Sequence, residues 1–395
     1  MRKFAIAVAV SASIAAPLDA LPTVTNLTAP AEAPLFGKFE ATFDVATAAN
    51  PYWPYDVSPN QGVPAGVGVS VDGLFSSDNW QTTITQPAFY YQDYTSSDHY
   101  QSDRTWLYPN GAAKWAIRFA PTAVGPWKFR IRATDSTGTT VSEEASFTCI
   151  PSTNRGFVRV SADDPRYFVL SGAPDGSGGT FLPMIGLNYD TPKVSDMEAK
   201  YAQLQNMGVN LIRSWWQSSS WALPFFGGGG QGGDLVWHNV VYSTEHLRHP
   251  AGSGHIVSAK LTSLHNGPPY KGLFSNAWVK PSTRYRAAAW IKTVGITGSG
   301  ASYGCYVYPT GRRLTGDNDW QEVSCEFTTE PAQYEAAGAV CMENVTGGAA
   351  YVSDVSLREV LDGGQLGPEL LPRPNLQAHT SFQQPIAWLI DRLLE

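Results

Sequence analysis

Residues 128–132 read Lys-Phe-Arg-Ile-Arg, and this alternation of polar and apolar side chains decides the fold class. Successive side chains of a β-strand point to opposite faces, so Phe129 and Ile131 are expected in a core while the basic residues face water. Residues 38–43 alternate in the same way, and turn-forming residues separate such stretches at short intervals. Residues 34–152 therefore predict an antiparallel β-sandwich of about a hundred residues.

The composition agrees with a folded, mainly β protein. Hydrophobic residues make up 43% of the 395 and charged residues 15%, whereas disordered chains are poor in the first and rich in the second. With 37 Gly, 28 Pro and 48 aromatic residues, the chain is rich in turns and rings. Its net charge of −7 argues against a nucleic-acid partner, which requires a basic surface, and leaves neutral glycans open.

The N-terminus has the pattern of an export signal. Met1-Arg2-Lys3 is basic, and Phe4 to Leu18 is apolar and rich in alanine. This run is typical of a secretory signal peptide and too short to span a membrane. The alternative is a buried N-terminal helix. We expect residues 1–20 to be removed, with cleavage after Ala15, Ala16 or Ala20, and the protein to be secreted, extracellular or periplasmic, with no membrane contact thereafter.

The four cysteines fit that compartment. Cys149 alternates with Phe147, which predicts a buried thiol on the inner face of a strand. Cys305, Cys325 and Cys341 lie within 37 residues of one another and can supply one disulfide. Their spacing does not identify the pair.

The pattern changes to mixed α/β after the sandwich. Residues 157–160 and 167–170 predict a small hairpin. Residues 181–188 and 209–216 are apolar strands, and residues 194–207 between them carry apolar side chains at helical spacing. Strand, helix and strand joined by short loops predict a parallel βαβ unit.

An all-β module follows within this α/β region. Six of the seven residues 227–233 are glycine, which predicts a flexible joint. Residues 234–361 return to antiparallel β patterning, residues 362–374 form a second joint, and residues 375–395 lead into a helical pattern. We therefore assign residues 153–226 and 375–395 to one α/β domain, interrupted by the module.

This layout resembles that of secreted bacterial glycosidases in which an immunoglobulin-like domain precedes a (β/α)8 barrel of the cellulase-like glycoside hydrolase clan. Residues 115–121 and 125–129 are similar to a strand-turn-strand of that N-terminal domain. The insert resembles a carbohydrate-binding module of the galactose-binding jelly-roll type, on residues 279–292, 319–323 and 351–357.

The resemblance implies a multidomain, mainly β chain: a β-sandwich, then the start of a (β/α)8 barrel interrupted by a β jelly roll. It also implies a retaining glycoside hydrolase, whose two carboxylates lie about 5–5.5 Å apart. The clan carries them on the fourth and seventh barrel strands, and a barrel needs about 250 residues. We therefore expect a fragment without the catalytic glutamates. The alternatives are a non-catalytic carbohydrate-binding or adhesion protein, and a purely structural envelope protein.

The α/β region supplies one set of candidate site residues. The clan has an arginine at the position of Arg213, where it bonds the nucleophile; the alternative is a structural ion pair. The residues that follow the two strands are expected to line a sugar subsite, since barrel enzymes act at that face. They are Asn188, Tyr189, Asp190, Trp215, Trp216 and Trp221, and packing beneath the module is the alternative for each.

The module supplies a second set. Trp237 and Tyr270 are candidate sugar-stacking residues, as are Trp278, Tyr303, Tyr306 and Tyr308. Trp290 and Trp320 match framework positions of the module and are expected in its core. Asp354 resembles a position that holds a structural calcium ion, and no other cofactor is expected. The module is inserted in a loop between a strand and a helix of the barrel, so it would bind polysaccharide or oligosaccharide and raise its concentration near the barrel. The enzyme is expected to be a monomer.

Overall fold

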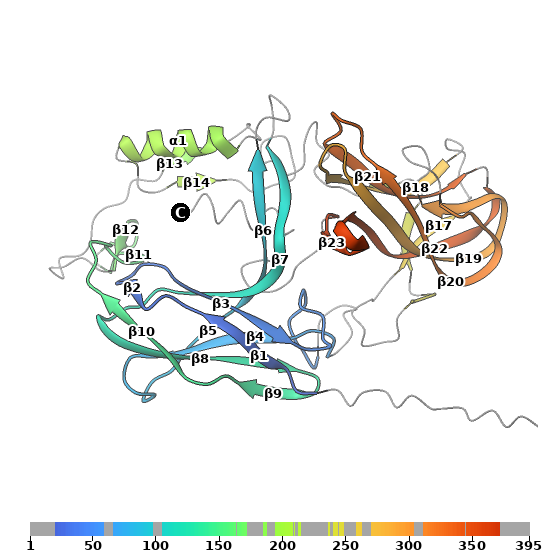
Figure 1. Ribbon diagram of the computed structural model, residues 1–395. Coiled ribbons are helices and arrows are strands. Elements are labelled where there is room, and N and C mark those ends of the chain that lie inside the picture. The colour runs from blue at the N-terminus through green and yellow to red at the C-terminus, as the bar shows by residue number, and fades with distance from the viewer. Residues whose placement is uncertain are drawn as a thin grey trace, which may run out of the picture.

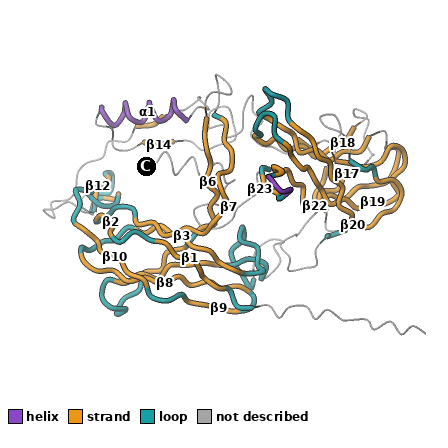
Figure 2. The backbone as a smooth tube through the Cα atoms, in the orientation of Figure 1, coloured by secondary structure: helices purple, strands orange, loops and turns teal. Residues whose placement is uncertain are grey.

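The computed structural model describes residues 20–58, 66–97, 105–162, 164–171, 185–187, 194–207, 209, 212–214, 236–237, 240–243, 245–248, 258–262, 270–303, 311–343 and 345–371. The expected signal sequence before Ala20 and the expected helix near the C-terminus lie outside them. Strands dominate this part of the chain (Figure 2). None of its helices is both long and apolar enough to cross a bilayer.

The N-terminal domain is the predicted β-sandwich, and it begins at Thr23, about ten residues earlier than expected. One sheet has the order β1 (Thr23–Thr28), β3 (Phe39–Ala46), β7 (Trp106–Phe119) and β6 (Phe89–Ser97). The other has the order β2 (Glu32–Pro34), β10 (Ala145–Ile150), β8 (Gly125–Asp135), β4 (Ser70–Ser76) and β5 (Ile84–Pro87), and β9 (Gly138–Val141) pairs with β8. All these strands pair antiparallel except β2 with β10.

The alternation in β8 has the consequence expected from the sequence. Phe129 and Ile131 are fully buried, whereas Lys128 and Arg130 reach the surface and pair with Glu144. Cys149 is buried as a free thiol beside Phe147, as predicted.

The α/β patterning is confirmed for its local elements. β11 (Val158–Val160) and β12 (Phe168–Leu170) form the predicted antiparallel hairpin. β13 (Ile185–Leu187) and β14 (Ile212–Ser214) pair in parallel, and α1 (Val194–Asn206) lies between them in the chain. The barrel that the resemblance implies is not formed by the described residues and stays a prediction.

The module is an antiparallel β domain of nine strands in the described residues (Figure 1). They are β15 (Val236–Trp237), β16 (Val240–Ser243), β17 (Ser258–Thr262), β18 (Tyr270–Trp278), β19 (Arg284–Tyr303), β20 (Leu314–Thr328), β21 (Glu335–Glu343), β22 (Val345–Val360) and β23 (Leu366–Glu369). The long strand β19 pairs with β20 and β22 and, at its last three residues, with β21. β19 thereby connects β15, β18 and β21 on one side with β22, β17 and β16 on the other.

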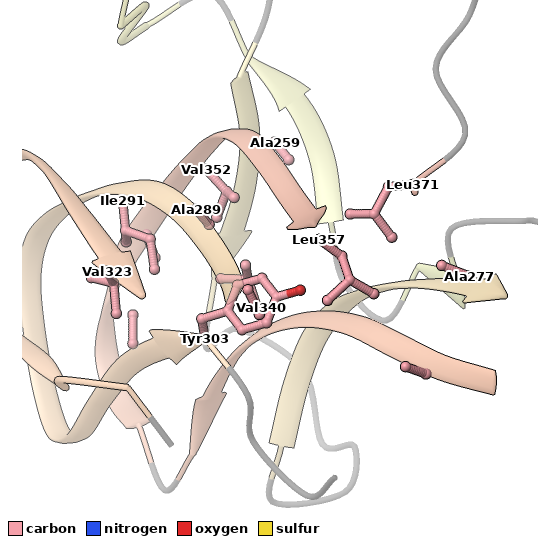
Figure 3. Packing of buried hydrophobic residues seen from close by; sticks show 14 of the residues in the cluster. Ala259, Ala277, Ala289, Ile291, Tyr303, Val323, Val340, Val352, Leu357 and Leu371 are labelled. Carbon is pink, nitrogen blue, oxygen red and sulfur yellow. The ribbon is translucent and has the colours of Figure 1, made fainter. Parts of the chain in front are cut away.

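The buried residues of the module form one core (Figure 3), to which β19, β22 and β21 contribute. The prediction that a joint begins at residue 362 is wrong, because residues 362–371 belong to the folded module. The short helix Asp362–Gly364 turns the chain back, β23 pairs with β22, and Leu370 and Leu371 are buried in the core. Gly363 and Gly364 make this turn possible because both have positive φ, at 80° and 78°.

Of the three clustered cysteines, Cys341 is disulfide-bonded and Cys325 is a free, half-buried thiol. Cys305, the third member of this cluster, lies outside the described residues.

Candidate functional site

The residues predicted for the barrel cleft are mostly ones that the structure does not describe. Asn188, Tyr189, Asp190, Trp215, Trp216 and Trp221 lie outside the described residues, as do Tyr306 and Tyr308. The backbone of Arg213 lies in β14 opposite Gly186. In the module, Trp237 pairs with Leu273 and Tyr270 with Glu343, which places them on the neighbouring strands β15 and β18. Their roles stay predictions.

Two other aromatic candidates are covered by the fold of the module. Trp278 is 6% exposed and Tyr303 is fully buried, so neither ring is open to a ligand in this structure.

The prediction that Trp290 and Trp320 belong to the core is wrong. The inward side chains of β19 are Tyr285, Ala287, Ala289 and Ile291, all fully buried. Because side chains alternate along a strand, Trp290 points to the opposite side, where it is half-buried. Trp320 in β20 is also half-buried and outside the core.

We call the outward side of the module the Trp290 face. It comprises Trp290 and Lys292 on β19, Lys260 on β17, Tyr351, Ser353 and Asp354 on β22, and the segment Glu245–Arg248 that lies against them.

The centre of the Trp290 face is the pair of Trp290 and Arg248. The guanidinium carbon of Arg248 lies 3.8 Å from the centroid of the Trp290 ring, a cation–π contact. The Nη1 group of Arg248 donates to Oδ2 of Asp354, and Ser353 Oγ donates to the same oxygen at 3.0 Å. Indole, guanidinium, carboxylate and hydroxyl thus meet in one cluster.

A β-bulge places the Asp354 carboxylate in this cluster. Trp290 pairs with Ser353 and Ala288 with Ser356, so β22 carries one more residue than β19 between these pairs. Asp354 lies in the bulge with φ of 50°. Bulges redirect side chains, and here the redirected carboxylate faces Arg248.

Calcium at Asp354 stays a prediction, which these contacts do not favour. Ca²⁺ takes six to eight oxygen ligands. One oxygen of Asp354 already accepts from a guanidinium, and the described residues contain no group of three or more His, Cys, Asp or Glu side chains that could hold a metal ion.

A second cluster on the Trp290 face surrounds Tyr351, which is 3% exposed because Glu245 and His246 pack against it. The Tyr351 hydroxyl donates to Oε2 of Glu245, and Lys260 Nζ lies 2.7 Å from the same carboxylate. The Lys260 ammonium holds the pKa of Glu245 below its usual value, and Glu245 in turn raises the pKa of Lys260. The His246 ring packs edge-on against Tyr351 at 4.6 Å. These contacts hold the Glu245 carboxylate and the Lys260 ammonium in fixed positions beside the Tyr351 ring.

The charges around Trp290 occur in pairs of opposite sign. Lys292 bonds Asp319 at 2.9 Å, which lowers the pKa of that carboxyl, and Arg286 bonds Glu322 at 2.7 Å. With Arg248–Asp354 and Lys260–Glu245, four cations face four carboxylates. Among the described residues around Trp290, these pairs therefore offer many hydrogen-bonding groups, and their charges balance.

Only part of this site is readable from the sequence. If the odd-numbered residues 285–291 are assigned to the core, the alternation of a β-strand predicts that the Trp290 side chain points away from it. Arg248, Glu245 and Tyr351 carry no such signal, because the segment that holds the first two follows a short strand and reaches β22, about a hundred residues away, only by folding.

No protein-family model and no curated protein sequence matches the chain. Among solved structures it is similar to a candidate glycoside hydrolase from Bacteroides vulgatus, at 17% identity and a TM-score of 0.30, over 47% of this chain and 28% of that one. It is similar to a family 16 carbohydrate-binding module at 19% identity and a TM-score of 0.23, over 31% of this chain and 86% of the module. A carbohydrate-binding module in complex with β-1,4-galactotriose is 12% identical, with a TM-score of 0.20 over 37% of this chain and 99% of that one. The chain thus spans 28% of the length of the first of these structures.

Proposed function

We propose that the chain binds glycan through the Trp290 face, within a secreted protein that acts on polysaccharide. The observation that carries this proposal is the half-buried Trp290 ring, which has the Arg248 guanidinium over one face, held there by Asp354 and Ser353.

The chemistry of a sugar matches this arrangement. A pyranose ring presents an apolar C–H face and a rim of hydroxyls, so it needs a flat apolar surface with donors and acceptors at its edge. The half-buried indole supplies the first through the side that Arg248 does not cover, and the guanidinium and carboxylate supply the second. Because these groups are already bonded to one another, little side-chain entropy is lost when a ligand binds.

The paired charges favour a neutral glycan. A polyuronate that approached Arg248 or Lys292 would also meet Asp354, Asp319 and Glu322, whose charges would repel it. Hydroxyl groups of a neutral sugar can instead donate to the carboxylates and accept from the cations.

Affinity electrophoresis of the full chain tests this proposal, with glucan, mannan, xylan and galactan as neutral polymers and polygalacturonate as the acidic one. We expect retardation by at least one neutral polymer, with little dependence on salt. Retardation by none of them, or by polygalacturonate alone with a steep loss in salt, would contradict the proposal.

The parallel unit β13–α1–β14 favours a second role, in glycoside hydrolysis. We propose that it begins the (β/α)8 barrel of a retaining enzyme, with Arg213 as a positioning residue for a carboxylate. No residue of this chain is assigned as one of the two catalytic carboxylates, so we expect the chain alone to bind a polysaccharide without releasing reducing ends. A protein in which the barrel is complete should release them, and binding without release by that protein would favour the non-catalytic alternative.

Secretion is proposed from the sequence of residues 1–20. Expression with these residues, followed by N-terminal sequencing of the exported protein, should find a start directly after Ala15, Ala16 or Ala20. An intact Met1 in a protein retained in the cell would contradict it.

A further inference from the structure

Two aromatic residues of the sandwich lie against the module. In the sandwich, β6 and β7 form a long antiparallel pair, and near its end Thr95 pairs with Tyr108 and Ser97 with Trp106. We call residues 95–97 and 106–108 the arm. In Figure 1 the pair β6–β7 rises from the sandwich toward the module, and β7 has contacts with β18 and β23.

The arm is hydrogen-bonded to the module. Trp106 Nε1 donates to the carbonyl oxygen of Val279 at 3.0 Å. The Tyr108 hydroxyl donates to Oε2 of Glu359 at 2.5 Å and lies 3.4 Å from the Tyr285 hydroxyl. Lys280 completes the set, because its Nζ lies 2.9 Å from Glu359 and 4.4 Å from the centroid of the Tyr108 ring.

The contact is also a hydrophobic one. Tyr108 is 3% exposed and belongs to the core cluster of the module rather than to that of the sandwich. Trp106 stacks on Tyr108 at 5.3 Å and packs against the same cluster. Burial raises the pKa of the Tyr108 hydroxyl, which therefore stays protonated as a donor.

The arm meets the module at one end of its core. Tyr285 pairs with Glu359, near the first residue of β19 and the last residues of β22. Val279 and Lys280 lie in the turn that enters β19. Tyr108 thus covers the end of the module's hydrophobic core at the Tyr285–Glu359 pair, and without it this end of the core would be exposed to water.

We infer that the arm closes the core of the module, so that sandwich and module form one cooperative unit despite the glycine-rich stretch 227–233 between their sequences. The module is then not an autonomous insert. Trp290 lies five residues beyond Tyr285, about 16 Å along the strand, so the arm leaves the Trp290 face open and fixes its direction relative to the sandwich.

Hydrogen exchange of the full chain without ligand, followed by mass spectrometry, tests this inference. In Tyr108→Ala, exchange in residues 284–291 and 355–360 of the module should accelerate by about tenfold or more, because a buried ring is lost from its core. Tyr108→Phe keeps the ring and should give a smaller acceleration. Tyr167→Ala, at a tyrosine that is 44% exposed and outside the arm, is the control and should leave both segments unchanged.

Acceleration confined to β6 and β7, with module strands at wild-type rates, would overturn the inference. If Tyr108→Ala does not fold, Glu359→Gln provides the reciprocal test. This change in the module should accelerate exchange in residues 106–108 of the sandwich, and unchanged rates there would also overturn it. Neither measurement requires a glycan, so a failure here is distinct from a failure of the proposed function.

Discussion

Arg248 and Trp290 are about forty residues apart in sequence, yet the guanidinium lies 3.8 Å from the centroid of the indole ring. Asp354, in a bulge of a third segment, holds the guanidinium there. The ring and its polar neighbours are therefore positioned before any ligand arrives, and substitution of each should have a different effect.

Removal of the ring should abolish most glycan binding. We expect Trp290→Ala to weaken the affinity for the neutral polymer retained by the wild type by about tenfold or more, as for a central aromatic contact. Isothermal titration calorimetry measures the change. Trp80→Ala is the matched control, since Trp80 is a half-buried tryptophan of the sandwich that bonds Glu144. Equal losses in the two variants would contradict a site at Trp290.

Loss of the Asp354 charge should alter selectivity. Asp354→Asn removes the ion-pair partner of Arg248, so we expect a two- to tenfold loss for the neutral glycan, about the net worth of a hydrogen bond. The less compensated guanidinium should also bind polygalacturonate more tightly. Asp362→Asn, at an exposed aspartate of the short helix, is the control. Unchanged binding of both polymers by Asp354→Asn would argue against a role for the pair.

The sandwich should lose stability in acid through Glu144. The pKa of Glu144 is lowered to about 2, first by the hydrogen bond from Trp80 Nε1 and then by Lys128. The unfolded chain binds this proton more readily, so the contribution of Glu144 is complete above about pH 4.5 and disappears as the pH falls through about 2. The difference in Tm between wild type and Glu144→Gln should be present at pH 7 and vanish near pH 2. Glu143→Gln, at the exposed neighbour, should show no such trend, and a constant difference for Glu144→Gln would refute this assignment.

A close backbone approach in the module should make Gly348 irreplaceable. Its φ is 89°, and a Cβ atom there would lie 2.3 Å from the carbonyl oxygen of Gly295. We expect Gly348→Ala to lower the free energy of unfolding by more than about 1 kcal/mol, measured by urea denaturation. Gly316→Ala separates the two causes, because Gly316 also has positive φ but no atom within 4 Å of its added Cβ. Equal losses would mean that φ alone matters.

Reduction should destabilise the module through Cys341. Cys341 is disulfide-bonded and fully buried, so Cys341→Ser should cost about 2–5 kcal/mol under oxidising conditions. Cys325→Ser, which changes a free thiol, should cost less. A Tm that dithiothreitol does not lower would contradict a stabilising disulfide.

The arm affects how the module should be probed. Deletion of residues 230–370 would uncover Trp106 and Tyr108 as well as remove the Trp290 face, so a loss of glycan binding would have two causes. Point substitutions on the Trp290 face avoid this problem.

Local pattern was sufficient for several elements of this protein, although it missed β1 and β23. The alternation of residues 128–132 predicted β8, the spacing of residues 194–207 predicted α1, and residues 157–160 and 167–170 predicted the β11–β12 hairpin. Such patterns are readable because each side chain is assigned to a core or to water by its neighbours in the same strand or helix. The alternation of β19 even contained the correct position of Trp290, although its match to a framework position led to the wrong assignment.

Only the tertiary structure decided which distant segments meet. Tyr108 belongs by sequence to the sandwich and by packing to the module, 177 residues from its contact Tyr285. Arg248 and Asp354 are 106 residues apart, and the bulge that joins them depends on the register between β19 and β22. Register and domain contact are set by the complementarity of whole surfaces, and no short window of sequence contains both sides of such a contact.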